Sequence, residues 1–159
     1  MKLSIIVPVF NEAPVLAQLH ARLSPVLRQL NVPYEVIFVN DASSDESLSV
    51  LKKLRELDQS YKIVELSRNL GQQLAITAGL DYGAGDAVIV MDDDLQDPPE
   101  LIPELVERWR EGYDVVCAVR QQRQGGDRDQ EAHRDSVLPF VEIPHHRRYP
   151  HRCGRVPPP

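Results

Sequence analysis

Three consecutive aspartates are the residues best suited to chemistry, in the stretch "VIVMDDDLQDPP" at 88–99. Carboxylates side by side repel one another, so the run costs stability unless something compensates it. Because neighbouring residues of an extended chain alternate sides, we expect Asp92 and Asp94 to point one way and Asp93 the other. Two carboxylates on one side, with no basic residue in the run, suit Mg²⁺, which leaves positions open for substrate phosphates. The run therefore predicts a site for a metal-bound nucleoside diphosphate; a solvated surface turn is the simpler alternative.

Two more polar clusters follow apolar runs, "PVFNE" at 8–12 and "NDASSD" at 40–45. Ligands of an open parallel sheet bind beyond the carboxyl ends of its strands, which is where such clusters would lie. Taken singly, each cluster is as well explained by helix capping through Asn11, Ser43 or Asp45. Three clusters together favour a binding site.

The elements that must position these clusters alternate along residues 1–120. Pro25 lies inside the first helical pattern and predicts a kink or break there. Asp97 is predicted to cap the last helix, with Pro98 and Pro99 at its entry. Strands alternating with helices predict an α/β fold with a mostly parallel sheet covered on both faces. The expected strands are 3–9, 35–39, 62–66, 86–91 and 114–119, and the expected helices are 13–30, 45–57, 71–82 and 99–111.

Composition excludes several classes of protein. The net charge of −6 argues against nucleic acid as a partner. Two cysteines make a disulfide framework improbable, and neither a signal peptide nor a membrane span is expected, so we expect a cytoplasmic location. The phosphate-binding patterns G-x-x-x-x-G-K-[ST] and G-x-G-x-x-G are missing from the sequence, which excludes a P-loop enzyme and a typical dinucleotide binder.

Five motifs in order resemble glycosyltransferase family 2, in its branch of dolichol-phosphate mannosyltransferases and bacterial polyprenyl-phosphate glycosyltransferases. They are "SIIVPVFNE", "VNDASSD", "SRNLGQQLAITAGL", "GDAVIVMDDDLQDPPELI" and "GYDVVCAVR", and they cover about 1–123. The resemblance implies the three-layer, Rossmann-like GT-A fold. It also implies metal-dependent transfer of a sugar from a UDP- or GDP-sugar to a polyprenyl phosphate, with inversion. Relatives of full length act at the cytoplasmic face of the membrane.

The resemblance also implies roles for individual residues on the nucleotide side. Asp41 would hold the base, and Arg68 and Asn69 match a motif near the donor site. The residues expected to line the nucleoside pocket are Pro8, Phe10, Asn11 and Glu12.

On the metal side, the resemblance makes Asp92 and Asp94 the catalytic D-x-D pair. Asp94 and Gln96 would ligate Mg²⁺ or Mn²⁺ together with the diphosphate, while Asp92 would face the donor sugar and the metal. Asp93 is usually alanine in this motif and is not expected to be a ligand. A lipid phosphate is already anionic, so a general base is unnecessary, and the metal would stabilise charge on the departing nucleoside diphosphate.

Residues 124–159 differ in character from the domain expected at 1–123. Beyond Arg120 the chain holds four of the five histidines, six of the thirteen prolines and no lysine, which predicts a disordered tail and a sheet incomplete at its C-terminus. A metal site from the histidines and Cys153 lacks a ligand spacing. Possible codons for 151–159, read one base later, give "TDVGEFRL", which resembles the continuation of the family. We therefore expect a frameshift within about 121–126 and a truncated chain with weak or no transfer activity.

Three other functions are compatible with parts of the sequence. A non-catalytic nucleotide-sugar-binding module fits the same residues. A nucleotidyltransferase would carry a glycine-rich basic loop after the first strand, and "PVFNEAPVL" has neither glycine nor lysine. A phosphatase using an aspartate nucleophile would have an early D-x-D and a later lysine, and no lysine follows Lys62. The sugar, the base and the oligomeric state stay open.

Overall fold

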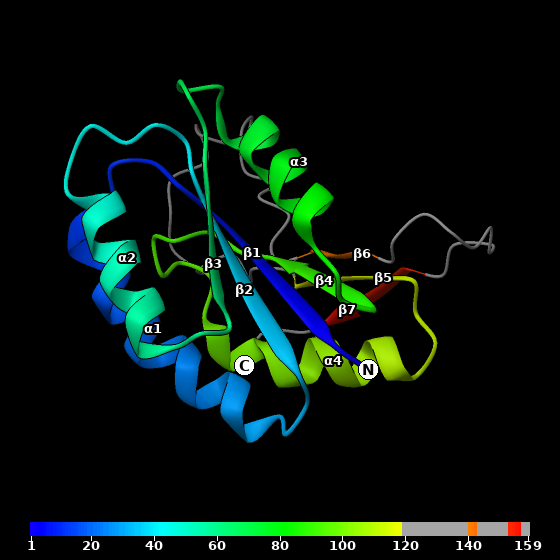
Figure 1. Ribbon diagram of the computed structural model, residues 1–159. Coiled ribbons are helices and arrows are strands. Elements are labelled where there is room, and N and C mark those ends of the chain that lie inside the picture. Colours follow the sequence, from blue (N-terminus) through cyan, green and yellow to red (C-terminus); the bar gives the residue numbers. More distant parts are fainter. Residues whose placement is uncertain (119–139, 143–152, 157–159) are drawn as a thin grey trace, which may run out of the picture.

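Seven strands form one sheet in the computed structural model, which describes residues 1–118, 140–142 and 153–156 (Figure 1). Their order is β3-β2-β1-β4-β6-β5-β7, and every described pairing is parallel except those of β6 with β4 and β5. All seven residues of β1 are buried, as expected for a parallel strand covered on both faces. The strands are β1 (Leu3–Val9), β2 (Tyr34–Asn40), β3 (Tyr61–Glu65), β4 (Ala87–Val90), β5 (Val115–Ala118), β6 (Phe140–Glu142) and β7 (Cys153–Val156).

Helices cover both faces of the sheet and make three layers (Figure 1). The helices are α1 (Ala13–Gln29), α2 (Ser47–Leu57), α3 (Gln72–Tyr82), the 3-10 turn η1 (Pro99–Leu101) and α4 (Ile102–Arg110). Side chains of α1, α2 and α4 share one core cluster with Leu3, Ile5 and Val7 of β1, whereas α3 packs on the other face against Ile6. A Cβ at Gly79 would lie 2.4 Å from Cγ2 of Ile6, so α3 approaches the sheet closely because that residue is glycine.

The predicted strands and helices of residues 1–118 are confirmed in type and order. Of the kink or break predicted at Pro25, the break does not occur, because α1 runs through it from Ala13 to Gln29, and the kink stays a prediction. Among the described residues, no helix combines the length and the apolar composition that crossing a membrane requires.

Most of the tail predicted at 124–159, including its histidines, lies outside the described residues. Its two described stretches form β6 and β7, where the sequence predicts disorder. β6 pairs with both β4 and β5, and β7 pairs with the other side of β5. The unpaired backbone groups at the side of a strand offer hydrogen bonds to any extended segment within reach, which accounts for this pairing.

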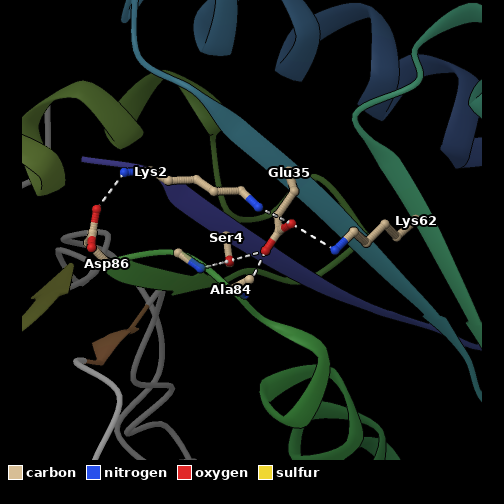
Figure 2. Close-up of polar contacts among 7 residues, drawn as sticks. Lys2, Ser4, Glu35, Lys62, Ala84 and Asp86 are labelled. Carbon is tan, nitrogen blue, oxygen red and sulfur yellow. Dashed lines mark hydrogen bonds and ion pairs between the residues drawn. The ribbon is translucent and has the colours of Figure 1, made fainter. Parts of the chain in front are cut away.

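A buried carboxylate ties together the amino-terminal ends of the parallel strands (Figure 2). Glu35 of β2 is 2% exposed, and its Oε2 accepts hydrogen bonds from Nζ of Lys2 at 2.6 Å and Nζ of Lys62 at 2.8 Å. Its Oε1 accepts bonds from Oγ of Ser4 at 2.6 Å and the N–H of Ala84 at 2.7 Å. Burial alone would raise the pKa of Glu35, but these hydrogen bonds outweigh it and lower the pKa to about 2.

Replacing Glu35 with glutamine should lower the free energy of unfolding near neutral pH by about 3 kcal/mol, because two lysines lose their buried partner. A carboxyl group whose pKa is lowered on folding stabilises the protein above its ordinary value of 4.5, and that contribution is lost as the pH falls towards 2. The difference between wild type and Glu35→Gln should therefore shrink across this window. Urea unfolding at a series of pH values measures it.

The control is Glu65→Gln, which removes the same charge at an exposed position of β3. Equal losses in the two variants, or a difference that does not change with pH, would contradict the stabilising role of Glu35.

Candidate functional site

A cleft of about 350 Å³ lies at the carboxyl ends of β1, β2 and β4. Its wall combines the loops that follow these strands with the first turn of α3, so segments far apart in sequence meet there. This is the edge of an open parallel sheet at which ligands bind. The residues that line it are Pro8, Val9, Phe10, Glu12, Asp41, Asn69, Gly71, Gln72, Ala75, Asp92, Asp93 and Asp94.

The cleft brings together most of the residues that the sequence predicts for the site. The predicted residues in its wall are Pro8, Phe10, Glu12, Asp41, Asn69, Asp92 and Asp94. Asn11, Arg68 and Gln96 are described but do not belong to the wall. Sequence reasoning did not include Gly71 or Gln72, although both directly follow the "RNL" of a recognised motif.

Asp41 joins the end of β2 to the loop before α3. It is 3% exposed, its Oδ1 accepts a hydrogen bond from the N–H of Leu70 at 2.7 Å, and its Oδ2 accepts one from the N–H of Gly71 at 2.8 Å. Gly71 has φ 88°, a conformation that glycine adopts without strain. The carboxylate of Asp41 therefore holds in place the loop that brings Asn69 and Gly71 into the cleft.

The loops after β1 and β2 are also bonded to each other. Oδ1 of Asn11 accepts a hydrogen bond from the N–H of Ser44 at 2.8 Å. The carboxylate of Asp45 bonds the first backbone N–H of two helices. It accepts hydrogen bonds from the N–H of Ala13 in α1 at 3.1 Å and from the N–H of Ser47 in α2 at 2.9 Å. The N-cap positions of α1 and α2 are Glu12 and Glu46, so Asp45 is not itself a cap, although it bonds the first N–H of each helix, and Asn11 crosslinks the two loops.

All three aspartates of the acidic run line the cleft, and the opposite orientation expected of the Asp93 side chain stays a prediction. The alternation of sides holds only for extended chain, and β4 ends at Val90, two residues before Asp92. The amide of Gln72 reaches across from α3, and its Nε2 donates a hydrogen bond to Oδ1 of Asp92 at 2.6 Å.

The loop after the acidic run turns sharply. Its bend includes Leu95, which has φ 62°, a strained conformation for a leucine whose side chain packs against the main core. Oδ1 of Asp94 accepts a hydrogen bond from the N–H of Gln96 at 2.9 Å. The sequence predicts Asp97 as the cap of the next helix, but the structure places Pro98 at that position, and the buried carboxylate of Asp97 reaches back to the N–H of Asp92 at 3.4 Å.

Negative charge in the cleft is poorly compensated. Oδ2 of Asp93 is buried and has no hydrogen-bond partner among the described residues. Burial, together with the charges of Glu12, Asp92 and Asp94, raises the pKa of Asp93 to about 7. None of the described residues lining the cleft is a lysine, arginine or histidine.

A hard divalent cation fits these oxygen donors, because it would neutralise charge that the wall leaves uncompensated. Within the described part of the chain, no three histidine, cysteine, aspartate or glutamate side chains are placed to surround one metal ion. Mg²⁺ takes one or two carboxylates and fills its other positions with water and phosphate oxygens.

Both the family model and the relatives that match this chain are glycosyltransferases. The family model described as glycosyl transferase family 2 matches residues 4–156. YkcC of Bacillus subtilis (strain 168), named an uncharacterized glycosyltransferase, is 52% identical over 122 residues, which cover 77% of this chain and 38% of that protein. The undecaprenyl-phosphate 4-deoxy-4-formamido-L-arabinose transferase of Klebsiella pneumoniae (strain 342) is 45% identical over 124 residues, with coverages of 77% and 38%. The chain thus spans well under half the length of these curated relatives.

Among solved structures, the mannosyltransferase PcManGT from Pyrobaculum calidifontis, in complex with GDP-Man and Mn²⁺, superposes with a TM-score of 0.63. The match covers 77% of this chain and 36% of that one at 23% sequence identity. At this identity the likeness shows a shared fold alone.

Replacing Asp93 with asparagine should raise the free energy of unfolding of the metal-free protein at about pH 8, because it removes an uncompensated buried charge. A carboxyl group whose pKa is raised from 3.8 to about 7 on folding destabilises the protein progressively as the pH rises through that range. The gain should therefore vanish below about pH 4. Urea unfolding in EDTA, with exposed Asp81→Asn of α3 as control, measures it; an Asp93→Asn variant less stable than wild type at high pH would contradict this interpretation.

Proposed function

The chain belongs to glycosyltransferase family 2, and from that premise we propose that the protein transfers a sugar from a UDP- or GDP-sugar to a polyprenyl phosphate, with inversion and with the help of a divalent metal. Its fold is the GT-A fold of the enzymes it resembles in structure. The observation that carries the proposal is the gathering of Asp92, Asp93 and Asp94 in a cleft at the strand ends, where Oδ2 of Asp93 is buried without a hydrogen-bond partner in the part of the chain that the structure describes.

Asp94 and Gln96 would hold Mg²⁺ or Mn²⁺, and Asp92 would face the metal and the donor sugar. The backbone N–H of Gln96 already orients the carboxylate of Asp94 at 2.9 Å, so the two residues form one tight turn. The metal, when bound with the diphosphate, stabilises the charge that develops on the leaving group. The similar fold of PcManGT, solved with GDP-Man and Mn²⁺, supports the assignment.

The nucleoside would lie on the β1 side of the cleft. Phe10 is 47% exposed and presents an aromatic face beside Pro8 and Glu12, which suits contact with a planar base or ribose. Both oxygens of Asp41 accept bonds from the chain, so any contact with the base would be additional to its loop-holding role. Asn11 and Arg68, which are exposed and do not line the cleft, are proposed as further nucleotide-binding residues.

The acceptor is proposed from the name of a relative, which identifies undecaprenyl phosphate as the lipid carrier for that enzyme. A phosphate acceptor is anionic near neutral pH, so the protein needs to orient it and has no proton to remove. Such a lipid would place the reaction at the cytoplasmic face of a membrane.

A non-catalytic nucleotide-sugar-binding module is the second candidate. The same cleft residues would serve it, because holding a nucleotide with its metal requires no acceptor. Transfer of a labelled sugar from donor to polyprenyl phosphate separates the two candidates, because a binding module gives nucleotide binding without labelled lipid.

Asp94→Ala should weaken Mn²⁺-dependent binding of UDP or GDP by roughly tenfold or more, since it removes a charged metal ligand. Calorimetric titration with and without Mn²⁺ measures the effect. Asp81→Ala, which removes an exposed aspartate of α3, should bind as wild type does. Metal-independent binding, or equal binding by the two variants, would refute the metal site.

A further inference from the structure

We propose that Gln72 is a positioning residue, which holds the carboxylate of Asp92 for the metal and donor while Asp41 fixes the start of the helix that carries it. The inference rests on the proposed function of the cleft. It goes beyond that function by assigning a role to a residue outside the acidic run and by linking the nucleoside side of the cleft to its metal side.

The contact between Gln72 and Asp92 is short and comes from a different layer of the fold. Nε2 of Gln72 lies 2.6 Å from Oδ1 of Asp92, and the two residues are 20 positions apart in the chain. One residue before Asp92, the chain that follows β4 is still bonded to β1: the N–H of Met91 donates to the carbonyl of Ile6 at 3.1 Å. The hydrogen bond across the cleft restricts the rotamers of the Asp92 carboxylate, in addition to the other interactions of Asp92.

The chemical type of the donor matters as much as its position. An amide carries no net charge, so it orients the carboxylate without neutralising it. A lysine or arginine at position 72 would instead form an ion pair with Asp92 and compete with a cation for its charge. A neutral donor therefore suits a carboxylate that must remain available to a metal.

The helix that carries Gln72 is anchored firmly at its start. Gly71 is its N-cap and has no side-chain capping bond, but the N–H of Gly71 donates to the buried carboxylate of Asp41 at 2.8 Å. One turn later, Ala75 is fully buried in the cluster that includes Ile6. Asp41 at the end of β2 thus sets where Gln72 begins α3, and Gln72 in turn meets Asp92 after β4.

The test compares Gln72→Met with Gln73→Met. Methionine keeps approximately the length and the helix propensity of glutamine but cannot donate a hydrogen bond. Both positions are exposed in the first turn of α3, so neither change should affect folding. Mn²⁺ affinity is measured by electron paramagnetic resonance in the presence of UDP or GDP, and the melting temperature is measured on the same samples.

We expect Gln72→Met to weaken Mn²⁺ binding about tenfold, the usual effect of losing a partner that orients a metal ligand. Its melting temperature should match that of Gln73→Met, whose affinity should be that of wild type. Asp41→Asn should weaken Mn²⁺ binding as well, but with a lower melting temperature, because an amide cannot accept both backbone bonds.

The outcomes separate this inference from the proposed function. If wild type binds Mn²⁺ and the nucleotide but Gln72→Met binds as tightly as Gln73→Met, the positioning role is wrong and the proposed function stands. If wild type binds no Mn²⁺ with either nucleotide, the proposed function itself is overturned, and the role of Gln72 with it.

Discussion

Repulsion between carboxylates in one cleft is the constraint on which the rest of this structure depends. Glu12, Asp92, Asp93 and Asp94 share a wall that contains no lysine, arginine or histidine among its described residues. Like charges gathered in this way raise the free energy of the folded protein, and a bound cation would offset that cost. The surrounding scaffold must therefore hold these groups together against their repulsion, through backbone bonds and a rigid sheet.

The two ends of the sheet show opposite solutions to burying a carboxylate. At the amino-terminal ends, Glu35 receives two lysines and two further hydrogen bonds, and its pKa falls to about 2. At the carboxyl ends, Asp93 is buried beside like charges, its Oδ2 has no hydrogen-bond partner among the described residues, and its pKa rises to about 7. The first arrangement stabilises the fold, whereas the second leaves charge uncompensated, and strained backbone accompanies it at Ala42 and Leu95, with φ 55° and 62°.

Most of the fold could be predicted from local patterns, because the apolar runs and helical periods of residues 1–118 depend on neighbours in sequence. The three polar clusters of the cleft could be predicted for the same reason. The contacts that hold them could not, since Asp41 meets Gly71 across 30 positions and Gln72 meets Asp92 across 20. The orientation of Asp93 could not be predicted with the same certainty, because strand geometry applies only as far as the end of β4 at Val90. The sequence does contain a signal for Glu35, which is the one charged residue of the apolar strand "YEVIFVN".

The most direct test of the central claim is the position of Mn²⁺ in crystals grown with UDP or GDP, located by its anomalous scattering. The account predicts one anomalous peak in the cleft, within coordination distance of Asp94 and Gln96 and beside Asp92, with the diphosphate on its open side. A peak elsewhere on the protein, or a nucleotide bound in the cleft with no metal beside the acidic run, would contradict it.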